Sequence, residues 1–211
     1  MMSYIPAPEH ILTAEQELVD ILGTPSPLIA DKATPFVTPL VQEFILSSPY
    51  FLLATAASNG SCDCTPRGDP AGAVLFLDER TLVFADRRGN RRVDSMRNML
   101  QNPHVGMLFL VPGTDETVRV NGRATISRDP ELRDRLSMQG KPAELAVIVA
   151  IDEVFTHCAR SILRSKLWQP ESWPDTDTIP TLAAMMAEQK NLQAPDESAG
   201  KRNEDYRAVL Y

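Results

Sequence analysis

The chain has 211 residues, a formal net charge of −7 and a sequence pI near 5.0. A chain of this length can bury one sizeable core, so we expect one main domain with terminal extensions. The acidic balance argues against a general nucleic-acid surface, and no apolar run is long enough to span a bilayer. Because the N-terminus lacks the basic and apolar regions of a signal peptide, we expect a cytoplasmic protein.

Three cysteines, an odd and small number, favour reduced thiols over a disulfide framework. Cys62 and Cys64 are two residues apart and would share one face of a strand. A zinc site would need a second pair of ligands, and only His157 with Cys158 comes near that spacing. We therefore expect no metal site and interpret the cysteines as small buried side chains.

The first 49 residues are expected to form a helical extension. The pattern Thr13-Ala-Glu-Gln16 is typical of a capping box and predicts a short amphipathic helix from about Ala14. Pro39 suits the first turn of a second helix, which should end before Pro49.

From Tyr50 the chain changes to short β-rich runs separated by turn residues, which is typical of an antiparallel sandwich or barrel. Asn59-Gly60 is a strong hairpin signal between the first two runs. We predict seven strands from these runs and expect the four before residue 86 to form a meander. The predicted strands cover residues 50–57, 61–65, 73–77, 81–85, 105–111, 117–127 and 145–154.

The run from Thr117 to Ser127 keeps apolar residues at even positions and polar or basic residues at odd ones, with Gly122 as a plausible bulge. We predict further helices over residues 130–138, 157–168 and 181–192. The second of these carries a cationic patch of Arg160, Arg164 and Lys166. The polar tail from Gln193 is expected to be disordered when it has no partner.

Positive charge is concentrated between Phe84 and Pro103, where five arginines occur at positions 87, 88, 91, 92 and 97. Gly89 would let the chain turn after a strand, and Asn90 would be the N-cap of a helix. Val93, Met96 and Leu100 would form its buried face. Because a helix start and guanidinium groups both attract anions, this stretch predicts a phosphate site; a solvated surface turn is the alternative.

The sequence lacks the glycine-rich Rossmann and Walker motifs and the Gly-x-Ser-x-Gly elbow. The three histidines are scattered, and His104 stands at a strand start, where a structural role is favoured over acid–base catalysis. Without a nucleophile, base or metal, any reaction would be carried by a bound cofactor.

Taken together, these motifs resemble the pyridoxamine 5'-phosphate oxidase-like flavoproteins, the FMN-binding split-barrel family, and within it a branch of FMN-dependent enzymes of unassigned substrate. The resemblance extends over about residues 50–168, in one consistent order. The matching pieces are Thr65-Pro-Arg-Gly-Asp-Pro70, residues 86–98, residues 102–113, Arg119-Val-Asn-Gly-Arg-Ala124, His157-Cys-Ala-Arg160 and Arg164-Ser-Lys-Leu-Trp168.

The resemblance implies a mainly β (α+β) fold, a six-stranded antiparallel Greek-key split barrel with flanking helices. It implies an N-terminal helical extension (1–49), the barrel (50–168) and a C-terminal helix and tail (169–211). It also implies a homodimer with FMN in the groove between subunits. The FMN-binding residues that it implies are Thr65, Arg67, Gly68, Asp86, Arg87, Asn90, Arg91, Arg92 and Ser95, with Arg164, Lys166 and Trp168 contributed by the partner subunit.

The sequence departs from the vitamin oxidase itself, because no histidine follows His157 to complete that enzyme's C-terminal substrate signature. We therefore expect an FMN-dependent oxidoreductase that exchanges hydride with another small substrate or a nicotinamide; no catalytic residue is identifiable. A flavin- or ligand-binding protein without turnover, such as a sensor or carrier, is the alternative. RNA binding through Arg119 and Arg123 is a weaker one, since exposed interleaved aromatics are lacking. Nucleic-acid and membrane partners are not expected.

Overall fold

The computed structural model describes residues 4–192 and residue 207. Contacts divide the chain into two units, residues 1–33 and residues 34–211, and each is described by itself. The predicted domain boundaries at residues 49 and 168 stay predictions.

The first unit contains the short 3-10 helix η1 (Pro8–His10) and the helices α1 (Glu15–Leu22) and α2 (Pro27–Ala30). The predicted helix near Ala14 is present, but Ala14 itself is the N-cap. The Glu17 carboxylate accepts hydrogen bonds from the backbone N–H groups of Thr13 and Ala14, at 2.9 and 2.8 Å. Glu17 therefore caps the helix, and not the Thr13 and Gln16 side chains that the sequence suggested.

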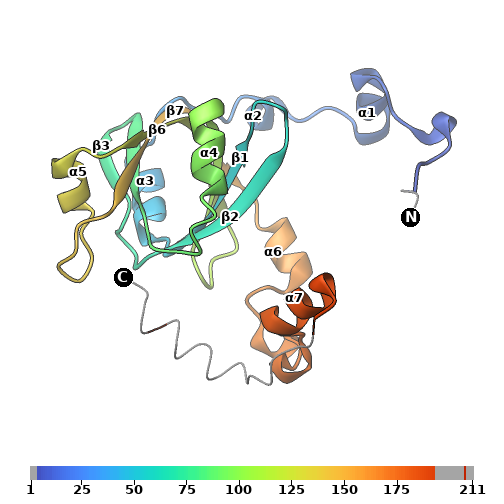
Figure 1. Cartoon of the computed structure of the whole chain (residues 1–211). Coiled ribbons are helices and arrows are strands. Elements are labelled where there is room, and N and C mark those ends of the chain that lie inside the picture. Colours follow the sequence, from blue (N-terminus) through green and yellow to red (C-terminus); the bar gives the residue numbers. More distant parts are fainter. Residues whose placement is uncertain (1–3, 193–206, 208–211) are drawn as a thin grey trace. The chain divides into compact units, whose positions relative to one another are not determined.

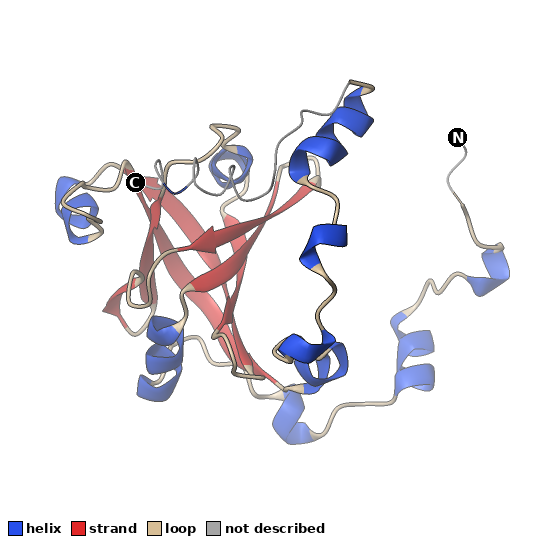
Figure 2. Ribbon diagram, turned by 90° about the horizontal axis from the view of Figure 1, so that it is seen from below, coloured by secondary structure: helices blue, strands red, loops and turns tan. Residues whose placement is uncertain are grey.

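The second unit is an antiparallel α+β split barrel (Figures 1 and 2). Its strands have the sheet order β2-β1-β5-β6-β7-β4-β3. They are β1 (Tyr50–Ala56), β2 (Cys62–Gly68), β3 (Leu75–Asp78), β4 (Thr81–Asp86), β5 (His104–Leu110), β6 (Thr117–Ser127) and β7 (Leu145–His157). The sheet thus has seven strands instead of six, because each predicted β-rich run forms a strand.

The expected meander is wrong in one respect. β1 pairs with β2 and β3 pairs with β4, but β2 and β3 lie at opposite ends of the sheet order. The segment after Gly68 therefore connects two separate hairpins. β4 pairs instead with β7, and β1 pairs with β5.

The helices of this unit are α3 (Pro39–Ser47), α4 (Asp94–Gln101), α5 (Pro130–Arg135), α6 (Arg160–Ser165) and α7 (Leu182–Lys190), with the 3-10 helices η2 (Pro170–Ser172) and η3 (Thr176–Thr178). Thr38 caps α3 with its side chain, and Pro39 occupies the first turn as predicted. α4 packs against β1, β2 and β6. No helix in the described part of the chain is both long and apolar enough to cross a membrane.

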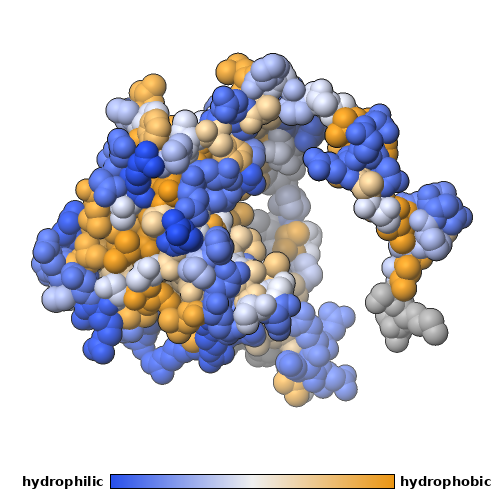
Figure 3. Space-filling view, turned by 90° about the horizontal axis from the view of Figure 1, so that it is seen from above, coloured by the Kyte–Doolittle hydropathy of each residue, from blue (hydrophilic) through white to orange (hydrophobic). Residues whose placement is uncertain are grey.

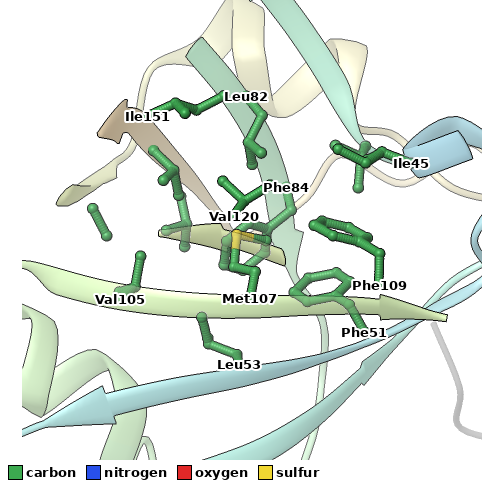
Figure 4. Packing of buried hydrophobic residues seen from close by; sticks show 14 of the residues in the cluster. Ile45, Phe51, Leu53, Leu82, Phe84, Val105, Met107, Phe109, Val120 and Ile151 are labelled. Atoms are coloured by element: carbon green, nitrogen blue, oxygen red, sulfur yellow. The ribbon is translucent and has the colours of Figure 1, made fainter. Parts of the chain in front are cut away.

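The core is formed by inward-facing residues of β1, β4, β5, β6 and β7, together with α3 and α4 (Figure 4). Phe51 packs against Phe84 edge-on, with ring centroids 5.3 Å apart, and against Phe109 at 4.9 Å. Ile45 of α3 is fully buried. The alternation along β6 is confirmed: Val118, Val120 and Ala124 are buried, while odd-numbered positions face away from this core.

The predicted bulge at Gly122 is also confirmed, because the β6–β7 register shifts between Asn121 and Gly122. A Cβ atom on Gly122 would lie 2.3 Å from the carbonyl oxygen of Ala150. Only glycine fits this approach between two strands.

The interpretation of the cysteines as buried side chains is wrong, since Cys62, Cys64 and Cys158 are all exposed. β2 is an edge strand, and Cys62 and Cys64 lie on the face of it that turns away from the protein interior.

Candidate functional site

A cavity of about 970 Å³ lies beside β2 and the end of β4. Its walls come from the edge hairpin, the segment after β2, the loop between β4 and α4, and the first turn of α4. Nine predicted cofactor residues line this cavity: Thr65, Arg67, Gly68, Asp86, Arg87, Asn90, Arg91, Arg92 and Ser95. The structure therefore brings together two sequence segments that were predicted separately.

One part of the cavity wall is apolar. Phe51, Val74, Phe84 and Met96 line it, and all four are buried residues of the core. Phe51 and Phe84 are among the labelled side chains of Figure 4. Such a wall suits a flat apolar ring, because aromatic side chains provide a large contact area in a defined geometry.

Two of the predicted arginines are already paired with carboxylates. Arg67 Nη1 lies 2.7 Å from Asp86 Oδ1, and Arg87 Nε lies 2.8 Å from Asp69 Oδ2. Arg87 also donates from Nη1 to the carbonyl oxygen of Leu136, at 2.9 Å. These side chains are roughly four-fifths buried, so each pair keeps its charges compensated at the cavity wall.

The same two pairs leave polar atoms unsatisfied. Arg67 Nε and Asp69 Oδ1 are buried and have no hydrogen-bond partner. Buried polar groups are normally hydrogen-bonded, and exceptions in a cavity wall are what a polar ligand would satisfy. Both atoms belong to residues of the cavity lining.

The loop from Arg88 to Arg92 carries the exposed positive charge. Arg92 Nε donates to Asp94 Oδ2 at 2.7 Å. Among the residues that the structure describes, Arg88 and Arg91 make no ion pair. Arg88 lines the cavity but was left out of the predicted set of cofactor residues.

The start of α4 differs from the prediction. Val93 is the N-cap, with φ of 53°, and Asn90 instead accepts a hydrogen bond from the backbone N–H of Arg92. Arg91 also has a positive φ, of 62°. Left-handed backbone at a β-branched residue costs about 1–3 kcal/mol, and such strain is concentrated at functional sites.

The buried face of α4 is also different, because Leu100 is 78% exposed while Ser95, Met96 and Met99 are buried. The Ser95 hydroxyl donates to Asp63 Oδ2 at 2.7 Å. The carboxylate of Asp63 on β2 thus lies at the first turn of α4, where the helix favours negative charge.

Residues predicted to come from a partner subunit lie outside this cavity: Arg164, Lys166 and Trp168. Arg164 and Lys166 are exposed, and Trp168 donates from Nε1 to the carbonyl oxygen of Thr114 at 2.8 Å. Trp168 is therefore anchored within its own chain.

Sequence reasoning missed the acidic partners Asp63 and Asp69 and the aromatic wall of Phe51 and Phe84. Asp63, Thr65 and Arg67 alternate along β2 and face the same side, a signal that could have linked the first of them to Arg67. The aromatic pair needs the tertiary fold, because its members lie on strands that are not neighbours in the sheet.

A second cavity of about 200 Å³ adjoins this site. It shares Asp86, Arg87, Arg88 and Glu144 with the first and is closed by the segment from Met138 to Ala143.

Solved structures resemble parts of the chain. HupZ from Group A Streptococcus is 14% identical, with a TM-score of 0.47 over 57% of this chain and 93% of HupZ. General Stress Protein 26 from Bacillus anthracis is 16% identical, with a TM-score of 0.42 over 55% and 88% of the two chains. An FMN-binding protein from Syntrophomonas wolfei is 13% identical, with a TM-score of 0.43 over 68% and 93%.

No curated protein matches the chain. A family model described as pyridoxamine 5'-phosphate oxidase matches residues 37–158. This match spans more than half of the chain and includes the strands and the arginine loop that form the cavity. The chain belongs to the pyridoxamine 5'-phosphate oxidase family.

Proposed function

We propose that the chain binds FMN in the 970 Å³ cavity and acts as an oxidoreductase on a small substrate or a nicotinamide. The observation that carries this proposal is the polarity of the cavity, with the aromatic pair Phe51 and Phe84 in one wall and the arginine loop in another. A flavin mononucleotide has the same division, an aromatic ring system at one end and a phosphate at the other. Membership of the family and the FMN-binding relative from Syntrophomonas wolfei also support FMN.

The charge of the lining indicates which residues would hold each part. Arg67 and Arg87 have carboxylate partners, so the phosphate would be held mainly by the loop cations Arg88 and Arg91, joined by Arg92. Asn90 and Ser95 would add polar contacts at the same end. The unsatisfied Arg67 Nε and Asp69 Oδ1 are suited to polar groups of the ring or the sugar chain.

FMN, when bound, supplies hydride transfer at N5 of its ring. The residues of this chain would then position the ring and set the charge around it. Arg67 lines the cavity and is the cross-strand neighbour of Phe51 in the apolar wall. A cation at this position would stabilise negative charge on a reduced flavin. The described residues of the cavity lining include no histidine, lysine or tyrosine, so proton transfer would rely on the substrate, on the lining carboxylates or on the Cys64 thiol.

We also propose that the chain forms a homodimer through one face of the sheet. The side chains of Leu52, Leu108, Arg119 and Phe155 follow one another across β1, β5, β6 and β7 on the side away from the core. All four are only partly buried, and Tyr50, next to them on β1, is 40% exposed. We call this surface the outer sheet face. A row of mostly apolar side chains on an incompletely buried sheet face is typical of an interface between copies.

The alternative is a flavin- or ligand-binding protein without turnover. The absence of histidine, lysine and tyrosine from the described cavity lining favours it, because it leaves only carboxylates and the Cys64 thiol for general acid–base catalysis. Both functions predict FMN uptake, so they differ only in the reduction of the bound flavin.

The test is a titration of the purified chain with FMN, in which quenching of the flavin fluorescence measures binding. We expect saturable binding of one FMN per chain, and then bleaching of the bound flavin by NADH or NADPH. Uptake without bleaching by any donor would support the binding protein, and failure to take up FMN would overturn both. Riboflavin, which lacks the phosphate, is the matched ligand and should bind more weakly.

A further inference from the structure

The segment from Tyr4 to Asp31, here called the N-terminal arm, has no core of its own. None of its residues is buried. Its large apolar side chains are visible as orange surface on the arm in Figure 3. The exposed leucines and isoleucines are Ile5, Ile11, Leu12, Leu18, Ile21, Leu22, Leu28 and Ile29, each at least 43% exposed, and Tyr4 is 90% exposed.

Helix α1 is the longest helix of this arm, and none of its residues is buried. It has eight residues, and isolated helices shorter than about 12–15 residues are marginal in water. Its apolar positions Leu18, Ile21 and Leu22 have helical spacing and are 46%, 67% and 78% exposed. An amphipathic helix of this kind is stabilised by packing its apolar face against another surface.

The charge of the arm restricts that surface. The arm carries five acidic residues and no lysine or arginine. Three of the acids, Glu15, Glu17 and Asp20, lie on α1 beside the apolar face. The complementary surface should therefore be apolar and basic.

Such a surface is present on α6 and the residues that follow it. Leu163 and Leu167 are 53% and 40% exposed and four residues apart. The exposed cations Arg160, Arg164 and Lys166 surround them, and residues 157–168 contain no aspartate or glutamate. Leu163 and Leu167, the latter just beyond α6, are four residues apart, as Leu18 and Leu22 are. Charges of one sign flank each leucine pair, basic at the first pair and acidic at the second.

We propose that α1 of one copy packs against α6 of a second copy of this chain. Leucine pairs would form the centre of the contact, and the acids of the arm would face Arg160, Arg164 and Lys166. Each copy carries both surfaces, so a two-fold arrangement covers both arms and both α6 surfaces at the same time. The proposal requires no flavin and can fail or hold independently of the proposed function.

Carbodiimide cross-linking of mixed light and heavy-isotope chains tests the identity of the partner. Lys166 is the only amine on the α6 surface, and its targets would be Glu15, Glu17 or Asp20. We expect cross-linked peptides that join one light and one heavy chain. Cross-links confined to peptides of one isotope would place the contact within one copy, and absence of these cross-links would also overturn the proposal.

Charge exchange tests the contact itself through amide hydrogen exchange of α1. The variant Glu15→Lys/Asp20→Lys and the variant Arg160→Glu/Arg164→Glu should each lower the protection of α1 roughly tenfold. A chain with all four substitutions should recover it. Glu9→Lys/Asp31→Lys, which changes the charge by the same amount outside α1, is the control and should leave protection unchanged.

If the four substitutions together give no recovery, or if α1 is unprotected in the wild-type dimer, the proposal is wrong. FMN titration of each variant is measured alongside, because Arg164 also belongs to the proposed cofactor residues. A wild-type chain that protects α1 but takes up no FMN would indicate failure of the proposed function and not of the contact. Loss of FMN uptake in the Arg160→Glu/Arg164→Glu variant alone would agree with Arg164 as a cofactor residue.

Discussion

The cavity and the outer sheet face each contain an arginine with a buried, unsatisfied Nε, but the two surroundings differ. Arg67 in the cavity has Asp86 at 2.7 Å, and further charges of both signs surround it. Arg119 on the outer face lies over the ring of Phe155, with its guanidinium carbon 4.4 Å from the ring centroid. Its cross-strand neighbour on β5 is Leu108.

This difference indicates what each region would accept. A carboxylate-paired arginine in a polar wall leaves room for a small charged or polar molecule. An arginine stacked on an aromatic ring, in a row of apolar side chains, is typical of a protein interface. The first region is suited to a cofactor and the second to another copy of the chain.

The largest expected effect concerns the sheet that supports both regions, because a change in its stability should affect the cavity and the outer sheet face alike. Gly122→Ala should lower the free energy of unfolding by about 3 kcal/mol or more, because its Cβ would meet the Ala150 carbonyl at 2.3 Å. Urea denaturation measures this, and both regions should lose their function together. Gly89→Ala is the matched control in the arginine loop, where no atom lies within 4 Å of the added Cβ. Equal stability of the two variants would contradict the bulge as described.

The next effect concerns the outer face alone. Leu52→Glu adds a carboxylate to its row of mostly apolar side chains at a position whose cross-strand neighbours, Pro66 and Leu108, carry no charge, and we expect the dimer dissociation constant to rise about 100-fold. Sedimentation equilibrium measures it. Glu131→Lys, a charge change on the exposed helix α5, should leave dimerisation unchanged. An undiminished dimer in the Leu52→Glu variant would exclude this face as the interface.

A smaller effect concerns the cavity alone. Arg88→Ala and Arg91→Ala should each weaken FMN binding roughly tenfold, since each removes a cation available to the phosphate. Riboflavin binding should change much less. Arg97→Ala removes an exposed arginine of α4 that does not line the cavity, and it should bind FMN like the wild type. If these two variants lose as much affinity for riboflavin as for FMN, the arginines do not bind the phosphate.

The smallest effect lies in the arm and should leave both regions unchanged. Hydrogen bonds from the backbone N–H groups of Thr13 and Ala14 lower the pKa of Glu17. A carboxyl whose pKa is lower in the folded state stabilises that state above its unfolded pKa, and the contribution is lost as pH falls through the folded pKa. The protection factor of the α1 amides, which is the intrinsic exchange rate divided by the observed one, should therefore fall on acidification, and Glu17→Gln should remove this dependence. Persistence of the pH dependence in the variant would assign it to another group.

The strands and turns of the barrel could be predicted because their signals are local. Alternation along β6, the Asn59-Gly60 turn and the bulge at Gly122 all depend on residues next to one another in the chain. The arginine-rich connection between β4 and α4 is a local signal of the same kind, as is the position of Pro39 in α3.

Features that depend on distant partners could not be predicted in this way. Asp69 and Asp86 compensate Arg87 and Arg67 only because the two hairpins meet at the cavity, although they occupy opposite ends of the sheet order. Helix α4 begins at Asp94 and not directly after Asn90. The hydroxyl of Ser95, in its first turn, donates a hydrogen bond to Asp63 on β2.

The amino-acid sequence by itself thus determined the order of strands and helices and the cluster of cations, since these follow from backbone preference and short-range patterning. The tertiary structure decided which of those cations are neutralised, which remain available to an anion and which apolar residues stand opposite them. The physical reason is that charge compensation and burial depend on distances between residues far apart in the chain, and only the packed sheet defines those distances.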